Sequence, residues 1–245
     1  MSTEWPTPAN IAQFSYSRVS CFDLFRGLPF RSFNGADPDP AICDLKVYQD
    51  YLTYCFISRN VPKGSRILEV GGGDSRILKF FAQDYECWNA DKCEGLGNGP
   101  IKFTSPNYRI VYDYIGSSNP ELPAGYFDLV FSISALEHTP EDQTIRVNVL
   151  NDINRVLKPG GFSLHCFDAI FRPAGNSWVN GLIPYLYANA PIQTRFSSLN
   201  EIAADPDTFA MSKAAYEEYW QPITKDSYEN FGRPFSINVF WTQRT

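Results

Sequence analysis

Hydrophobic and polar residues follow one another along this chain in blocks of two kinds. Short apolar runs bounded by Gly, Pro, Asp or Asn are typical of strands, and longer stretches with apolar residues three or four apart are typical of helices. The expected strands are 66–70, 87–90, 108–112, 127–132, 162–167 and 236–242, and the expected helices are 44–60, 75–85, 140–158, 178–188 and 212–220. Strands that alternate with helices at this spacing predict right-handed βαβ units, a mostly parallel sheet and an α/β fold.

The clearest helix start lies after the fourth expected strand. Thr139 is expected to cap this helix, Pro140 suits its first position, and Asp142 lies at the capping-box spacing. Residues 1–43 have no such periodicity, and we expect an irregular arm with one short helix there.

Charge and composition limit the classes of partner that we expect for this chain. The net charge is −6 and no Lys/Arg cluster occurs, whereas a nucleic-acid-binding surface needs many cations, so we expect no nucleic acid partner. The apolar runs have strand length and the first residues lack signal-peptide features, so we expect no membrane segment and a cytoplasmic protein. The six cysteines include no CxxC pair, and we expect buried thiols with neither disulfides nor a metal site.

The candidate chemistry begins where the first strand runs through a glycine turn into a helix. Gly71, Gly72 and Gly73 allow a tight turn and the close approach of a ligand, and the helix start adds N–H donors. Asp91 ends the next strand, where a carboxylate can accept hydrogen bonds from two ribose hydroxyls. Together these residues indicate a cofactor that contains a nucleoside.

Two residues bear on which cofactor it is. The dinucleotide fingerprint requires a small residue where this chain has Arg76. Glu69 would repel a pyrophosphate but attract the ammonium group of S-adenosylmethionine (SAM), so the electrostatics favour SAM over NAD. A nicotinamide-dependent oxidoreductase stays open as an alternative, as does a non-catalytic SAM-binding or scaffold protein.

With these motifs the chain resembles the class I SAM-dependent methyltransferases, especially the broad small-molecule group with an LEH signature. The sequence LEVGGGDS resembles the family loop E-x-G-x-G-x-G, with Ser75 in place of the last glycine. SISALEHTPED resembles the exit of the fourth strand, and RVLKPGGFSLH resembles the turn into the fifth. The resemblance covers roughly residues 60–168.

The resemblance implies the fold and the organisation of the chain. It implies a doubly wound, mostly parallel seven-stranded sheet of order 3-2-1-4-5-7-6, with SINVFWT as the antiparallel seventh strand. We expect a single methyltransferase domain over 1–245, with an N-terminal arm and helix (1–60), a SAM-binding core (61–168), and an acceptor-side lid with the terminal strand (169–245). The aromatic residues of the arm and of 170–225 suit a lid over the acceptor, or else simple packing onto the sheet.

The resemblance also implies roles for individual residues. Asp91 would bind the ribose, and Asp113 with the N–H of Tyr114 would hold the adenine. The implied cofactor-binding set is Glu69, Gly71, Gly72, Gly73, Asp91, Asp113, Tyr114 and Ser132.

Two residues are candidates for a catalytic role. His138, after the fourth strand, could deprotonate an acceptor or organise its loop, and Asp168 is a second candidate base at the end of the fifth strand. Positioning alone also suffices for many methyl transfers. His165, inside the fifth strand, is expected to be a core histidine with its hydrogen bonds satisfied.

The absence of two motifs points to the acceptor class. The chain has neither the [ND]-P-P-[YF] motif of amino-methylating enzymes nor the Pro-Cys nucleophile of cytosine C5 enzymes after the fourth strand. We therefore expect direct transfer of the SAM methyl group to a small molecule. The acceptor, the methylated atom and the oligomeric state are left open by the sequence.

Overall fold

The computed structural model describes residues 4–95, 99–172 and 177–244 of the 245. Its contacts divide the chain into two compact units, each assembled from segments far apart in the sequence. The arm unit consists of Met1–Asn60, Asp168–Val179 and Phe196–Asn238, and the core unit consists of Val61–Phe167, Asn180–Arg195 and Val239–Thr245.

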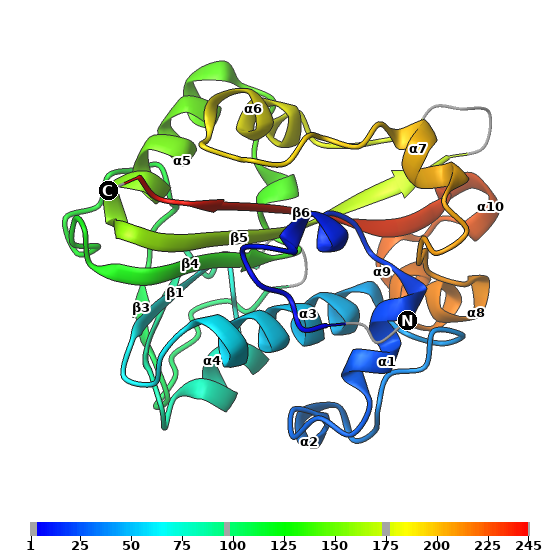
Figure 1. The fold of residues 1–245 in the computed structure, drawn as a ribbon, viewed down its shortest axis with the longest axis horizontal. Coiled ribbons are helices and arrows are strands. Elements are labelled where there is room, and N and C mark those ends of the chain that lie inside the picture. The colour runs from blue at the N-terminus through cyan, green and yellow to red at the C-terminus, as the bar shows by residue number, and fades with distance from the viewer. Residues whose placement is uncertain (1–3, 96–98, 173–176, 245) are drawn as a thin grey trace. The chain divides into compact units, whose positions relative to one another are not determined.

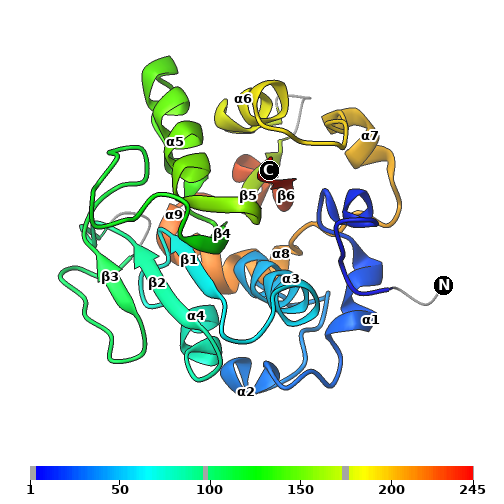
Figure 2. The ribbon, with the colours of Figure 1, turned by 60° about the vertical axis from the view of Figure 1, so that its left-hand side comes forward.

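The core unit is built on a parallel sheet. Its first four strands are β1 (Arg66–Val70), β2 (Glu86–Ala90), β3 (Arg109–Val111) and β4 (Phe127–Ile133), within the sheet order β3-β2-β1-β4-β5-β6 (Figures 1 and 2). The parallel pairs β1–β2, β1–β4 and β2–β3 bring the carboxyl ends of these strands to one edge. This confirms the predicted α/β fold and places the turns after these strands side by side.

The last two strands, β5 (Leu157–Phe171) and β6 (Arg233–Thr242), contribute residues to both units. In the core unit Gly160 N donates to Gln243 O at 3.0 Å, while the Phe162 ring lies 6.0 Å from that of Phe240. Because residue numbers rise along β5 as those of their partners fall along β6, β6 is antiparallel, as expected for the terminal strand. The described sheet has six strands where the resemblance implied seven.

The helices of the core unit are α4 (Arg76–Phe81), α5 (Gln143–Val156) and α6 (Leu182–Asn189). The prediction that Thr139 caps α5 is wrong. Asp142 is the cap, since its side chain accepts from Ile145 N at 3.0 Å, and Pro140 precedes it. Thr139 instead closes a short 3-10 turn over Leu136–His138, donating its N–H to Leu136 O at 3.1 Å, so the longer helix begins later.

In the arm unit, α3 (Leu45–Asn60) confirms the helix predicted over 44–60. The described residues before it form several short helices where one was expected. These are α1 (Phe22–Phe25), α2 (Arg31–Asn34) and two 3-10 helices, Ile11–Phe14 and Val19–Cys21. The Phe22 ring lies 5.6 Å from the Tyr48 ring of α3 and 4.9 Å from the Phe209 ring. The aromatic residues of the arm therefore build a hydrophobic core within this unit.

The arm also lies along the part of β6 that belongs to the arm unit. Tyr16 forms an antiparallel bridge with Ile237, Ser17 N donates to Ser236 O at 2.9 Å, and Asn238 N donates to Ser15 O at 2.8 Å. In the implied order 3-2-1-4-5-7-6, a further strand would pair with this edge of the terminal strand. In this protein residues of the arm pair with the edge instead.

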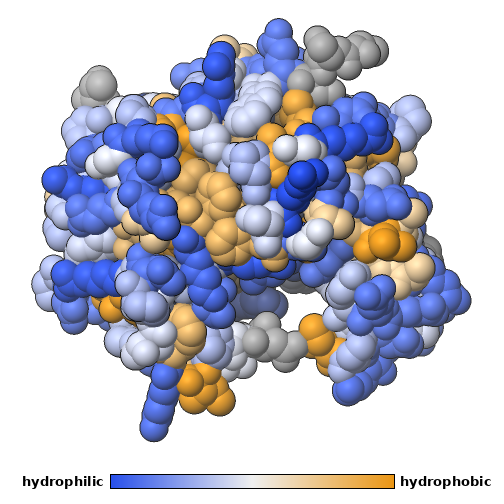
Figure 3. Space-filling model, turned by 90° about the horizontal axis from the view of Figure 1, so that it is seen from below, coloured by the Kyte–Doolittle hydropathy of each residue, from blue (hydrophilic) through white to orange (hydrophobic). Residues whose placement is uncertain are grey.

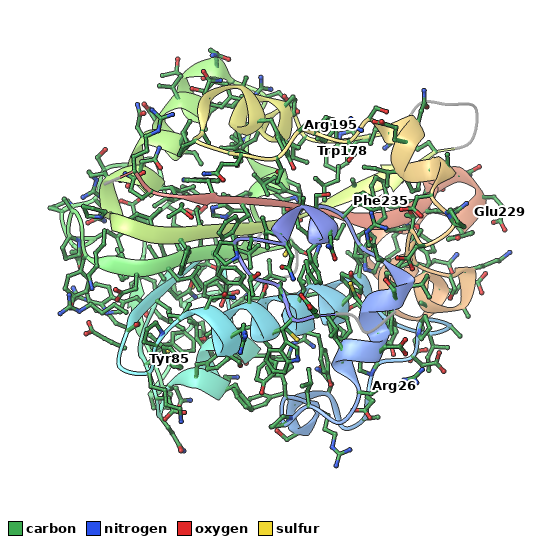
Figure 4. The ribbon with its side chains drawn as sticks, in the orientation of Figure 1. Arg26, Tyr85, Trp178, Arg195, Glu229 and Phe235 are labelled. Carbon is green, nitrogen blue, oxygen red and sulfur yellow. The ribbon has the colours of Figure 1, made fainter. Side chains whose placement is uncertain are left out.

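Neighbouring contacts fix the end of β5 in the arm unit. Ile170 and Trp178 exchange two backbone hydrogen bonds of 2.8 and 3.0 Å. The rings of Phe171 and Phe235 stack at 3.9 Å between centroids (Trp178 and Phe235 are labelled in Figure 4).

The remaining helices of the arm unit are short. They are α7 (Leu199–Ala204), α8 (Lys213–Ala215), α9 (Gln221–Thr224) and α10 (Tyr228–Phe231). The helix predicted over 212–220 is present as α8 followed by a π-helical turn over Tyr216–Trp220.

None of the helices in the described ranges combines the length and apolarity needed to cross a membrane. On the face shown in Figure 3, hydrophobic residues stand in separate groups among hydrophilic ones.

Candidate cofactor site

The site begins with the turn between β1 and α4, residues 71–75, which we call the glycine loop. Gly71 and Gly73 have φ values of +69° and +51°, which L side chains rarely adopt. A Cβ on Gly72 would lie 2.6 Å from Glu69 Cδ, and a Cβ on Gly71 would lie 2.6 Å from Ala135 Cβ. All three glycines are therefore required by backbone conformation or by close packing.

Four N–H groups of the glycine loop donate to acceptors of the core unit itself. The pairs are Gly71 N to Ala90 O (2.9 Å), Gly72 N to Asn89 Oδ1 (3.1 Å), Gly73 N to Asp91 Oδ2 (2.8 Å) and Ser75 N to Tyr108 Oη (3.0 Å). A phosphate bound at a glycine-rich turn needs such groups as donors. Here they are already engaged, so the loop is suited to a ligand without phosphate.

Glu69 and Ser75 are linked at the base of the loop. The Glu69 side chain is buried, and the Ser75 hydroxyl donates to its Oε2. The same hydroxyl accepts from Leu78 N at 2.9 Å and so caps α4. The serine that replaces the last glycine of the family loop therefore fixes both the carboxylate and the helix start.

Asp91 lies at the end of β2 against the glycine loop. Its Oδ2 accepts from Gly73 N at 2.8 Å and its Oδ1 accepts from Cys93 N at 2.7 Å. An ionised carboxylate has about four acceptor sites, so these two bonds leave capacity for ribose hydroxyls. The side chain is held where the sequence predicted a ribose-binding acid.

Asp113 follows β3 and organises its own loop. Its carboxylate accepts from Tyr114 N, Ser117 Oγ and Asn119 Nδ2 at 2.8–2.9 Å. Burial by itself would raise the pKa of Asp113, but the hydrogen bonds from Asn119, Tyr114 and Ser117 hold it below its usual value. The Tyr114 N–H, expected to reach adenine, is donated to the Asp113 side chain in this structure, so the adenine assignment stays a prediction.

The Tyr114 side chain is exposed and belongs to a small charged cluster. Its hydroxyl donates to Glu94 Oε2 at 2.8 Å, and Lys92 Nζ lies 5.0 Å from its ring centroid. The ends of β2 and β3 are therefore joined by side chains on the solvent side of Asp91 and Asp113.

Ser132 is directed into the core. Its hydroxyl and that of Ser163 each lie 2.8 Å from a ring nitrogen of His165, which is fully buried. Burial lowers the pKa of His165 to about 3, so the ring is neutral, and the prediction of a satisfied core histidine is confirmed. The Ser132 hydroxyl is engaged there and the residue is buried between β4 and β5, so its role in cofactor binding stays a prediction.

His138 ends the 3-10 turn after β4. Its side chain is 59% exposed, and its Nε2 lies 3.9 Å from Oε1 of the buried Glu137. Asn180, which the sequence analysis did not single out, donates to Glu137 O and Thr139 O at 2.9 and 3.0 Å. His138 is thus exposed on a turn that is held by the Asn180 side chain, two residues before α6.

Asp168, the other candidate base, belongs to the arm unit. Its Oδ1 accepts from Gln49 Nε2 at 3.0 Å. It is not among the residues that the core unit brings together.

Asn89 and Tyr108 also contact the glycine loop, although no motif in the sequence predicted them. Asn89 is paired with Glu69 in the β1–β2 register, and a polar residue inside the apolar strand CWNA was the signal that could have found it. Tyr108 precedes β3 and lies 33 residues beyond Ser75, so no local pattern connects it with the glycine loop.

Comparisons with known proteins bear on this site. Residues 68–164 match the family described as methyltransferase domain. Among curated protein sequences, none matches the chain.

Similar solved structures share low identity with this chain. A TehB-like SAM-dependent methyltransferase from Corynebacterium glutamicum is 20% identical, over 63% of this chain and 73% of that one, with a TM-score of 0.40. A putative sarcosine dimethylglycine methyltransferase from Galdieria sulphuraria is 14% identical, over 75% and 80%, with a TM-score of 0.49. Phosphoethanolamine N-methyltransferase 2 from Haemonchus contortus is 13% identical, over 76% and 50%, with a TM-score of 0.45.

Proposed function

We propose that this protein is a class I SAM-dependent methyltransferase that transfers the methyl group of SAM directly to a small-molecule acceptor, because residues 68–164 match the methyltransferase domain family. The observation that supports SAM as the cofactor is the glycine loop, in which the N–H groups of Gly71, Gly72, Gly73 and Ser75 are engaged while a buried carboxylate lies beneath it. SAM supplies a methyl group activated by a sulfonium, and it carries an ammonium group but no phosphate.

The residues of the core unit fit this cofactor. Glu69 places carboxyl oxygens beneath the loop, where we position the methionyl ammonium, and Asp91 has acceptor sites left for ribose hydroxyls. Asp113 is held ionised by its hydrogen bonds and is available to accept from the exocyclic amine of adenine. We assign these three carboxylates to the three parts of SAM.

A nicotinamide cofactor fits the same residues poorly. Its pyrophosphate would meet loop N–H groups that already donate to Asn89, Asp91 and Tyr108. Glu69 would repel its charge from below. Both features disfavour a nicotinamide-dependent oxidoreductase.

The acceptor is proposed to be a small molecule rather than a nucleic acid. The net charge of −6 opposes the many phosphate contacts that nucleic acid binding requires. The exposed His138 at the carboxyl edge of the sheet is the proposed group for accepting a proton or orienting the acceptor. Residues of the arm and of 170–225 are proposed to select the acceptor.

Calorimetric titration tests the cofactor assignment. SAM and S-adenosylhomocysteine should bind to the purified protein, and NAD should not. A panel of small amines, thiols, phenols and carboxylates, incubated with SAM, should then include one that gives S-adenosylhomocysteine. Binding of NAD in preference to SAM, or turnover only on nucleic acid, would contradict the proposal.

A further inference from the structure

We infer that Asn89 and Tyr108 are positioning residues that set the affinity for SAM by holding the glycine loop in one conformation. The inference rests on SAM as the cofactor. It adds two side chains for which neither the motifs nor the family match gives a role.

Both side chains bridge a donor and an acceptor of the loop. Asn89 accepts from Gly72 N at 3.1 Å and donates from Nδ2 to Gly73 O at 3.1 Å. Tyr108 accepts from Ser75 N at 3.0 Å and donates to the same Gly73 O at 2.9 Å. The two side chains therefore converge on one carbonyl oxygen at the centre of the loop.

These bonds are formed in the interior of the core unit. Asn89 is fully buried and Tyr108 is 6% exposed, so water competes little for their partners. They come from β2 and from the residue before β3, so neighbouring strands of the sheet hold the loop in addition to the hydrogen bonds of its own Ser75.

This arrangement has a consequence for binding. A loop that is ordered before the ligand arrives loses less conformational entropy on binding than a mobile loop does. Removing the Tyr108 hydroxyl would leave Ser75 N without that acceptor and Gly73 O with one donor fewer. The loop would then sample other conformations, and SAM would bind only to a fraction of molecules.

Tyr85 provides a matched control. It is 8% exposed, and its hydroxyl donates to Val61 O at 2.8 Å, away from the glycine loop (labelled in Figure 4). Tyr85→Phe thus removes a buried tyrosine hydroxyl from the same unit. It is expected to lower the stability without changing the loop.

The test compares Tyr108→Phe with Tyr85→Phe in the full-length protein. Calorimetry with S-adenosylhomocysteine should give a Kd about tenfold higher for Tyr108→Phe, the size expected for two lost hydrogen bonds, and an unchanged Kd for Tyr85→Phe. In protein without ligand, the amides of Gly72, Gly73 and Ser75 should exchange faster in Tyr108→Phe than in the wild type. In Tyr85→Phe they should exchange at the wild-type rate. Both variants should show small decreases in Tm.

Asn89→Ala completes a double-mutant cycle with Tyr108→Phe. Because both side chains donate to Gly73 O, the increase in Kd of the double variant should be smaller than the product of the two single increases. If Tyr108→Phe kept the wild-type Kd and the wild-type exchange of the loop amides, the inference would be wrong, whether or not Asn89→Ala folds. A wild-type protein that binds no S-adenosylhomocysteine would contradict the proposed cofactor instead, and the exchange measurement would still decide the role of Tyr108 in the loop.

Discussion

At the scale of single residues, the site depends on carboxylates whose surroundings differ. Glu69 is buried beneath the glycine loop, Asp91 is half-buried beside it, and Asp113 is held by its own loop. Replacing such a carboxylate by a neutral residue removes hydrogen bonds that hold the neighbouring loop. Substitutions of Asp91 and His138 test the proposed roles directly.

Asp91→Ala is expected to weaken SAM binding by about 1.5–3 kcal/mol, the range for a lost charge-assisted hydrogen bond. The protein should stay folded, because the side chain is half-buried and the groups that lose an acceptor, Gly73 N and the backbone and thiol of Cys93, lie in the loops beside it. Calorimetry measures the affinity, and circular dichroism verifies the fold. Asp74→Ala is the control, since Asp74 is an exposed carboxylate of the same loop paired with Lys79; equal losses of affinity in both variants would refute the ribose assignment.

His138→Gln is expected to lower the methyl transfer rate while leaving the Kd for SAM unchanged. The side chain is exposed at the end of its turn, so its removal disturbs little of the core. Once an acceptor is known, kcat as a function of pH and calorimetry with SAM measure the two effects. Unchanged turnover together with an unchanged pH profile would exclude both the base and the organising role.

At the scale of elements, strands β4 and β5 enclose a group that links stability to pH. Their register pairs Ser132 with His165, and the imidazole is bonded to two serine hydroxyls in the interior. The pKa of His165 is lowered to about 3 by burial, whereas in the unfolded chain it should be near 6.5. Because the unfolded state then binds the proton more readily, this group destabilises the fold as the pH falls below about 6.5.

We therefore expect the free energy of unfolding to fall by about 2 kcal/mol between pH 7 and pH 5 through His165 alone. Urea unfolding of the wild type and of His165→Gln at both pH values measures it, because the carboxylates contribute equally to both proteins. Glutamine keeps groups able to bond with Ser132 and Ser163 but does not titrate. Identical pH dependences for the two proteins would show that His165 is not held neutral.

At the scale of the whole molecule, the chain is divided differently from the simple order of arm, core and lid. The arm unit gathers residues from three parts of the sequence, and its N-terminal residues pair with the part of β6 in that unit. Side chains between Phe14 and Phe30 belong to its hydrophobic interior. The arm is thus part of a folded unit, and its role as a cover for the acceptor stays a proposal.

Hydrogen exchange of the ligand-free protein tests this directly. The amides of Ser17, Phe209 and Asn238 donate to backbone carbonyls within the arm unit, and we expect them to be protected without SAM or acceptor. Ser32 serves as the faster-exchanging comparison, because it is exposed and its amide donates to Pro29 O within a single short turn. Rapid exchange at all three amides, slowed only by ligand, would show that the arm is ordered on binding.

The sequence by itself determined the elements and the location of the cofactor turn. β1 agrees with the predicted strand residue for residue, α3 differs from its predicted range by one residue, and the glycines follow β1 as expected. Periodicity and glycine punctuation are properties of consecutive residues, so they can be interpreted without knowing what packs against them. For the same reason the sequence placed Asp91 and Asp113 after strands of a parallel sheet.

Only the tertiary structure decided which side chains complete that turn. Asn89 reaches the glycine loop because β1 and β2 pair in one register, and Tyr108 reaches it because β3 lies next to β2. The same holds for the edge of β6, where the arm pairs more than 200 residues away in sequence. Such contacts depend on strand register and on the satisfaction of buried polar groups, which are settled only when distant segments pack together.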